Sequence, residues 1–337
     1  MKRLISILVV LCWLHIGASA QDLHFTQNHY IPAYTNPAYS TLFNGDYRFS
    51  GIIRNQWRSV TKPYTSTALG FDGKLQRQYI NNVNLGGGIV ILNDQAGDSQ
   101  YSTTGSLFNL NASFNPGNDS VHFVYVGLQP GIFQRSINFD KLKFDNQYNG
   151  SIFDPTLPTG EQFGSSNFTY FDLGLGLAWH YVINDRLNTT LGYSQQHLNK
   201  ANQTFFDNVE VPLQQKKSIT ADANYVINNL FTVQPMFLYQ EQSEFNQILT
   251  GGLINYKMTN PKLQNAVIQT GFLYRNKDAF SVLMGYRFNN YNFGLAYDIN
   301  VSSLSQASNG RGAIEFGINY IITTVKPICD IKVCPIY

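Results

Sequence analysis

Charged side chains are scarce in this 337-residue chain, and their scarcity excludes several classes of protein. Lysine and arginine number 23 against 21 aspartates and glutamates, so only 13% of the residues are charged and the formal net charge is +2. An ordinary soluble domain carries about twice that charged share. Because no run of basic residues could neutralise a row of phosphates, we expect no nucleic-acid partner.

Long hydrophobic runs are also missing beyond the N-terminus. No apolar stretch of about 20 residues follows it, which excludes a bundle of membrane-spanning helices. The N-terminus itself carries Lys2 and Arg3, then an apolar run over residues 4–16, then small residues. This layout predicts a signal peptide over residues 1–20 that is cleaved near Ala20.

Cysteine is nearly absent, and so are the usual catalytic motifs. Of three cysteines, Cys12 lies in the expected signal peptide, which leaves Cys329 and Cys334. In an oxidising compartment these two could form a disulfide, whereas a lone pair lacks the ligands of a structural zinc site. Histidine pairs at metal-binding spacing, a nucleophile elbow and a phosphate-binding loop are missing as well. We therefore expect no metal, no cofactor and no enzymatic activity.

What the chain does contain is strand after strand from about residue 47. Bulky apolar residues alternate with small or polar ones over residues 171–183, 291–299 and 313–322, with a period of two. In a soluble sandwich the polar set would be rich in lysine and glutamate, but here it is glycine, serine, asparagine, threonine and alanine. Many strand ends carry tyrosine or phenylalanine. These features favour a membrane barrel over a secreted sandwich.

The predicted fold class is all-β: a transmembrane antiparallel β-barrel of about 14 strands, in a single domain over residues 47–322. Connections after even-numbered strands are mostly short, whereas three long ones, over residues 135–167, 198–215 and 300–311, follow odd-numbered strands. Bacterial barrels keep short turns on the periplasmic side. We therefore expect the protein in the cell outer membrane, with both chain ends in the periplasm.

Two end segments complete the predicted layout. Residues 21–46 are not strand-like and would start in the periplasm. They could fold into the lumen as a plug, dock a partner, or simply lead into the first strand. Residues 323–337 would form a periplasmic C-terminal tail.

By parity, nine charged residues of both signs are expected to face the interior. They could line a selective pore or form a paired network, and we favour the network because buried charges persist when they have partners. The residues are Arg48, Arg54, Asp72, Asp172, Asp222, Arg275, Arg287, Asp298 and Glu315.

A set of short polar and glycine-containing motifs is spread along the chain in a definite order. It comprises Asn36, Pro37 and Ala38; Arg54, Asn55, Gln56 and Trp57; Asp172, His197 and Leu198; Asp298; and Asn309, Gly310, Arg311, Gly312 and Glu315. In order and spacing these motifs resemble the PorP/SprF family of type IX secretion system outer-membrane proteins. The chain departs from that family at Ile336, where many members carry a basic residue after the last proline.

The resemblance implies an accessory barrel that supports export or surface attachment of large cargo proteins such as adhesins. It also implies a Bacteroidetes-type bacterium and a link to gliding motility. The implied partners are cargo with a type IX C-terminal signal, periplasmic or lipoprotein components that bind peptidoglycan, and outer-membrane lipid. The resemblance implies no catalytic residue.

A second hypothesis comes from the transporter class. The same barrel could be an outer-membrane solute channel or a transporter of hydrophobic substrates that resembles the FadL kind. The two hypotheses differ in whether the lumen is open.

Overall fold

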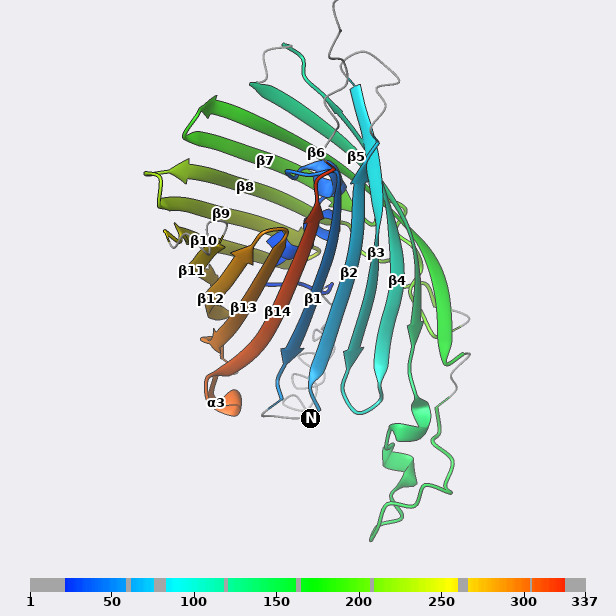
Figure 1. Cartoon of the computed structure of the whole chain (residues 1–337). Coiled ribbons are helices and arrows are strands. Elements are labelled where there is room, and N and C mark those ends of the chain that lie inside the picture. The colour runs from blue at the N-terminus through cyan, green and yellow to red at the C-terminus, as the bar shows by residue number, and fades with distance from the viewer. Residues whose placement is uncertain are drawn as a thin grey trace, which may run out of the picture.

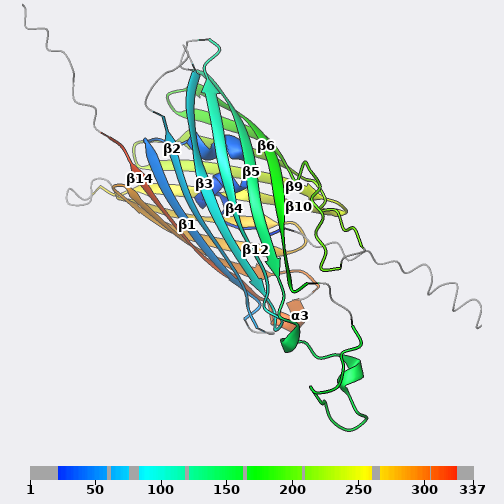
Figure 2. The same cartoon turned by 90° about the vertical axis from the view of Figure 1, so that its right-hand side faces the viewer.

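In the described part of the chain, fourteen antiparallel strands close into one barrel, and each strand pairs with its neighbours in sequence. The computed structural model describes residues 22–58, 62–75, 83–117, 121–161, 165–206, 209–259, 266–303 and 305–324. Figures 1 and 2 show the inclined strands surrounding a lumen that holds short helices from the N-terminal part. The strands are β1 (Tyr47–Gln56), β2 (Tyr64–Lys74), β3 (Val83–Ala96), β4 (Tyr101–Phe114), β5 (His122–Ser136), β6 (Asn167–Asn184), β7 (Leu187–Gln196), β8 (Lys216–Val226), β9 (Phe231–Gln242), β10 (Phe245–Lys257), β11 (Ala266–Arg275), β12 (Ala279–Phe288), β13 (Tyr291–Asn300) and β14 (Arg311–Ile322).

The seam between the first and last strands closes the barrel. β1 pairs with β14 in continuous register, from Tyr47 opposite Ile322 to Asn55 opposite Ile314. No edge strand is therefore left with unpaired backbone N–H and C=O groups, which a membrane could not satisfy. The predicted all-β, single-domain barrel is confirmed.

The alternating pattern assigns the two faces of the wall correctly. On β6, Leu175 is 46% exposed while its neighbours Gly174 and Gly176 are buried in the interior; on β14, Phe316 is 47% exposed while Glu315 is buried. Since successive side chains of a strand point to opposite faces, the bulky apolar set forms an outer band and the small polar set faces the lumen.

The two ends of the barrel differ in their connections. Asn184 caps the tight β6–β7 turn by accepting hydrogen bonds from the amides of Arg186 and Leu187, and β12 and β13 are joined by Asn289 and Asn290 alone. We call this the short-turn end. The opposite, long-loop end carries residues 137–161, 165–166, 197–206, 209–215, 301–303 and 305–310, with short helices η3 (Phe139–Lys141), η4 (Asp145–Gln147) and α3 (Ser305–Ser308).

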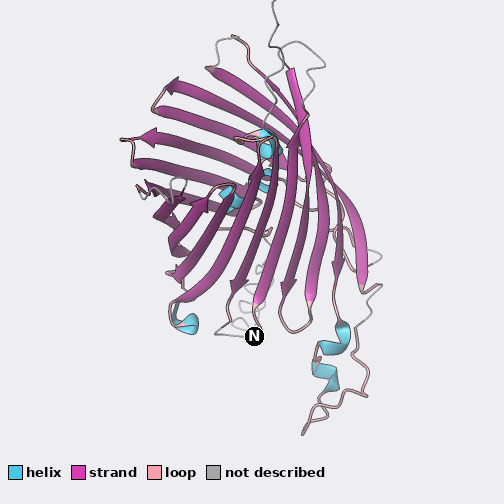
Figure 3. Ribbon diagram, viewed as in Figure 1, coloured by secondary structure: helices cyan, strands magenta, loops and turns pink. Residues whose placement is uncertain are grey.

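The residues before β1 run through the lumen. They form η1 (Asn28–Tyr30), α2 (Pro32–Thr35) and η2 (Pro37–Thr41), the helices that Figure 3 shows inside the ring of strands. Asp22 contacts His197 at the long-loop end, whereas the Asp46 amide donates to the Ile322 carbonyl at the short-turn end. The sequence-based expectation placed the start of this segment beside the short turns; the structure places Asp22 at the other end. None of the described helices is long and apolar enough to span a membrane.

Candidate functional site

The N-terminal residues 22–44, which we call the lumenal segment, are held by side chains of the barrel wall. One group of contacts is of a single kind: wall amides, hydroxyls and cations donate to main-chain carbonyl oxygens of the segment. Polar groups buried in this way need such partners. The donors and the carbonyls that they reach are Gln129 to Ala33 (2.8 Å), Gln196 to Tyr34 (2.8 Å), Ser194 to Thr35 (2.7 Å), Asn111 to Ala38 (2.8 Å) and Arg48 to Tyr39 (3.2 Å).

Glycines on the inner face make room for the lumenal segment. A Cβ on Gly176 would lie 2.0 Å from Asn36 Oδ1 and 2.9 Å from the Pro37 ring, and a Cβ on Gly317 would lie 2.6 to 2.9 Å from the Tyr30 ring. Such distances are far below contact separation. The small inward residues read from the sequence therefore serve close approach between wall and segment.

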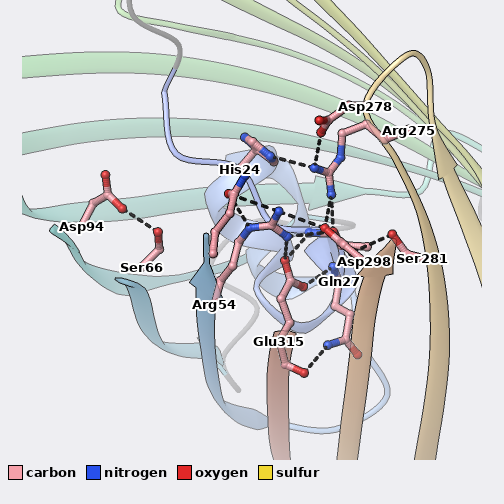
Figure 4. Close-up of polar contacts among 12 residues, drawn as sticks. His24, Gln27, Arg54, Ser66, Asp94, Arg275, Asp278, Ser281, Asp298 and Glu315 are labelled. Carbon is pink, nitrogen blue, oxygen red and sulfur yellow. Dashed lines mark hydrogen bonds and ion pairs between the residues drawn. The ribbon is translucent and has the colours of Figure 1, made fainter. Parts of the chain in front are cut away.

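A buried ion cluster joins the start of the segment to five strands. Arg54 on β1 donates to Glu315 on β14 (2.5 Å) and to Asp298 on β13 (2.9 Å), and Arg275 on β11 donates to the same Asp298 oxygen (3.0 Å). Figure 4 shows both guanidinium groups directed at this carboxylate. Ser281 of β12 also donates to Asp298, at 2.7 Å. Opposite charges are thus paired inside the lumen, as buried charges require.

The same cluster grips the lumenal segment through its main chain. Glu315 accepts hydrogen bonds from the amides of Thr26 (2.7 Å) and Gln27 (2.9 Å), one on each oxygen. The Thr26 hydroxyl lies within 3.2 Å of both Asp298 oxygens. Charge-assisted hydrogen bonds of this kind are stronger than neutral ones, so the ionic network of the wall is also the anchor of the segment.

A second anchor lies at the long-loop end. His197, just after β7, donates through Nε2 to Asp22 (2.5 Å) and through Nδ1 to Asp172 of β6 (2.9 Å). Burial lowers the pKa of His197, but the two carboxylates outweigh burial and raise it to about 9. Burial also raises the pKa of Asp22, yet the charges of His197 and Lys216 hold it well below its usual value. The histidine is therefore cationic at neutral pH and locks Asp22 in place.

A cavity of about 600 Å³ remains on the other side of the segment. It lies between the lumenal segment and the inner faces of β7 to β14, with Arg48 of β1 beside it, and it reaches the short-turn end, where Asn289, Asn290 and Thr323 line it. Asp222 on β8 and Arg287 on β12 also line it. Among the described residues, neither of these two charges has an ion-pair partner.

The family comparison decides the identity of the barrel. The model of the type IX secretion system membrane protein PorP/SprF family matches residues 17–320. The chain belongs to the PorP/SprF family. No curated protein matches its sequence. The barrel described above is therefore an outer-membrane barrel of a type IX secretion family.

Solved structures similar to this PorP/SprF barrel are outer-membrane channels. The toluene transporter TodX of P. putida is 12% identical, with a TM-score of 0.50 over 87% of this chain and 94% of that one. The monoaromatic hydrocarbon channel CymD is also 12% identical, with a TM-score of 0.51 over 91% of this chain and 96% of that one. At this identity the likeness shows the fold alone.

The structure brings several PorP/SprF motif positions together around the lumenal segment. Arg54, Asp298 and Glu315 meet in the ion cluster, although they lie up to 261 residues apart. Asp172 and His197 meet at the second anchor. Asn36 accepts from the Ala38 amide (2.9 Å) and donates to the Leu177 carbonyl (3.0 Å), with Pro37 between.

Other motif positions shape the strand ends. The Leu198 amide donates to the Leu173 carbonyl (2.9 Å), and Gln56 lies 3.4 Å from Arg54 Nε. Asn55 lies in the β1–β14 register, Trp57 packs on Tyr64 with ring centroids 4.9 Å apart, and Arg311 lies opposite Ile299. Asn309 and Gly310 adopt positive φ angles of 51° and 71° before β14. A Cβ on Gly312 would lie 2.4 Å from the Asp298 carbonyl oxygen.

Two outcomes concern residues that the sequence reading treated differently. Cys329 and Cys334 lie outside the described residues. Asp22 and Thr26 of the segment, and Gln129 and Gln196 of the wall, make anchoring contacts but were not singled out, because their partners lie far from them in the sequence. Within the described ranges, no group of three or more histidine, cysteine, aspartate or glutamate side chains could hold a metal ion.

Proposed function

We propose that this PorP/SprF barrel is an accessory, non-enzymatic component that supports export or surface attachment of large cargo proteins such as adhesins. The observation that carries the proposal is the lumenal segment, which is anchored at its start through Asp22, Thr26 and Gln27, crosses the lumen and continues into β1. A barrel filled in this way is suited to binding and scaffolding, and it does not offer a conduit for a bulky polypeptide.

The orientation follows from the connections. Short turns face the periplasm in bacterial barrels, so the short-turn end with its cavity would meet periplasmic or lipoprotein components that bind peptidoglycan, and cargo with a type IX C-terminal signal. The long loops would face the cell exterior. Cleavage near Ala20 would leave the new N-terminus at the long-loop end, beside the anchor at His197.

Deleting the gene and comparing surface proteomes tests this function. We expect one or a few large surface proteins to be lost, together with gliding where the host glides, while growth on single nutrients is unchanged. Complementation with the wild-type gene should restore the surface proteins. An unaltered surface proteome in the deletion strain would count against a secretion role.

A transporter role is the second candidate, because the structural neighbours named above are channels and because a 600 Å³ cavity is present. Planar bilayers separate the two roles. A closed barrel that gives no steady conductance supports the accessory role, whereas a stable conductance that a solute blocks supports the channel. A nutrient phenotype without loss of a surface protein would support the channel as well.

A further inference from the structure

The cavity that reaches the short-turn end has a lining rich in primary amides. Ten of its 27 lining residues are asparagine or glutamine, and six of these project from strands of the wall. Each primary amide offers two donors and an acceptor, so the wall presents the same two kinds of group that a peptide bond presents. Such a lining matches a polypeptide main chain.

The barrel already binds a polypeptide in this manner on the filled side of the lumen. Gln129, Gln196 and Asn111 donate their side-chain amides to main-chain carbonyls of the lumenal segment, all at 2.8 Å. On the cavity side the same residue types project from β7 to β14, and some of them bond to one another, as Gln234 does to Asn224 (3.1 Å) and Gln269 to Asn255 (2.7 Å). The filled side therefore shows what the amides of this wall can hold.

Two charged residues of the cavity lining indicate further which ligand it would bind. Arg287 and Asp222 line the same space, and among the described residues no carboxylate pairs with the first and no cation with the second. A guanidinium binds a carboxylate through two parallel hydrogen bonds. The free end of a polypeptide supplies such a carboxylate, and a basic side chain near that end supplies a cation for Asp222.

A sugar polymer fits the lining less well, because the aromatic rings are engaged. The Phe43 ring is covered by Arg48, 4.5 Å from its centroid, and lies 4.9 Å from Lys74 Nζ. The Tyr39 hydroxyl is hydrogen-bonded to Thr220, and His29 leans on Tyr30 with ring centroids 4.7 Å apart. The Phe43 and His29 rings already contact other side chains, as does Tyr291, which stacks on Phe293 with ring centroids 6.0 Å apart, so few aromatic faces of the lining remain for a sugar ring.

We propose that the cavity binds the extended C-terminal end of a polypeptide that enters from the periplasm. Its main chain would hydrogen-bond to the asparagine and glutamine side chains, its terminal carboxylate would meet Arg287, and a basic side chain would meet Asp222. The volume of about 600 Å³ lies within the usual range for a specific ligand site. The biological meaning of this site rests on the proposed secretion role, but its test does not.

Calorimetric titration of the purified full-length barrel in detergent tests the proposal. The probe is an N-acetylated alanine tetrapeptide with one lysine and a free C-terminal carboxylate. We expect it to bind at least about tenfold more tightly than its C-terminal amide, since a charge-assisted pair is lost in the amide. Methylating the backbone nitrogens should weaken binding by about tenfold as well. Chitotetraose serves as the sugar probe and should bind more weakly than the free acid.

Variants assign the contacts. Arg287→Gln should remove the preference for the free acid over the amide, while Arg287→Lys should retain part of it. Asp222→Asn should remove the preference for lysine over norleucine in the probe. The matched control is Arg135→Gln, at the long-loop end, where Arg135 lies over the Tyr170 ring at 5.6 Å; this change should leave all preferences as in the wild type.

The outcomes separate the cavity from the secretion role. Equal binding of free acid, amide and methylated peptide, or tighter binding of chitotetraose, would overturn the proposal even if the deletion strain still loses surface proteins. Specific peptide binding together with an unchanged surface proteome would retain the site and reject the secretion role. Each variant is first checked for the folded, heat-modifiable electrophoretic form. Should a variant fail to fold, the relative affinities of the wild-type barrel for the four probes still test the proposal.

Discussion

The two sides of the lumen are built from the same alternating strands, but only one of them is filled. Toward β1, β6 and β14, the lumenal segment packs against the wall, and Arg54, Asp298 and Glu315 are paired. Toward β8 and β12, Asp222 and Arg287 face a cavity. Within the described ranges, the wall charges on the filled side are therefore paired with one another, whereas these two charges on the cavity side have no ion-pair partner.

Removing the filling should have the largest effect. Deleting residues 22–44 leaves the strands and the wall ion pairs in place but empties the lumen, so steady single-channel conductance should appear in planar bilayers where the wild type is closed. Asp154→Asn, in the exposed β5–β6 loop, is the control and should remain closed. A silent deletion variant that has folded would show that some other part of the chain blocks the lumen.

The paired and unpaired carboxylates give a matched test of the comparison. Asp298→Asn removes the partner shared by Arg54 and Arg275 and should lower the free energy of unfolding by about 3 to 5 kcal/mol. Asp222→Asn breaks no ion pair and should change it by less than about 0.5 kcal/mol. Denaturant titrations in detergent measure both. Similar losses for the two variants would mean that Asp222 has a partner equivalent to those of Asp298.

These charges also show how far the sequence could be read. Parity placed Asp298 and Arg54 in the interior correctly, because the period of two needs only local sequence. It could not pair them, since the two residues are 244 positions apart and meet only when β1 closes on β14. The expected interior network is confirmed for Arg48 with Asp72 and for the ion cluster, but not for Asp222 and Arg287.

The lumenal segment was the least predictable part. Its direction through the barrel depends on contacts such as Asp22 with His197, which join residues 175 positions apart. Nothing periodic in residues 21–46 could indicate them, so plug, docking segment and simple lead-in were indistinguishable in the sequence. The cavity could not be predicted from the sequence for a related reason, because its volume is the space that the segment leaves against the wall.

Two inward-facing glycines on β6 test how closely the segment packs against the wall, because alanine adds a single methyl group at each. Gly176→Ala would place a Cβ 2.0 Å from Asn36 Oδ1, and this oxygen is fixed because it accepts from the Ala38 amide. We expect a cost of about 1 to 3 kcal/mol in the free energy of unfolding. Gly174→Ala meets nothing closer than 3.4 Å and should cost less than about 0.5 kcal/mol. Equal costs would contradict the close packing of the segment at Gly176.

The smallest expected effect is a pH dependence at the His197 anchor. The pKa of His197 is raised from 6.5 to about 9, so the stabilisation that it supplies is complete below pH 6.5 and is lost as pH rises through about 9. Hydrogen exchange of residues 22–30, corrected for the intrinsic rate, should show protection falling between those values. In His197→Gln the protection should be lower and independent of pH over this range; an unchanged profile would assign the dependence to another group.

The course of the lumenal segment has a consequence for anything attached ahead of it. The segment begins at the long-loop end of the barrel and joins β1 at the short-turn end, so it passes through the whole lumen. An epitope fused directly before Asp22 would therefore emerge beside the long loops, across the membrane from the turns where the first strand starts. Either β1 pairs with β14 while the segment already lies inside the barrel, or the free N-terminal end of the segment enters after the barrel has closed. In the second case, the residues ahead of the segment would have to be removed before it could enter.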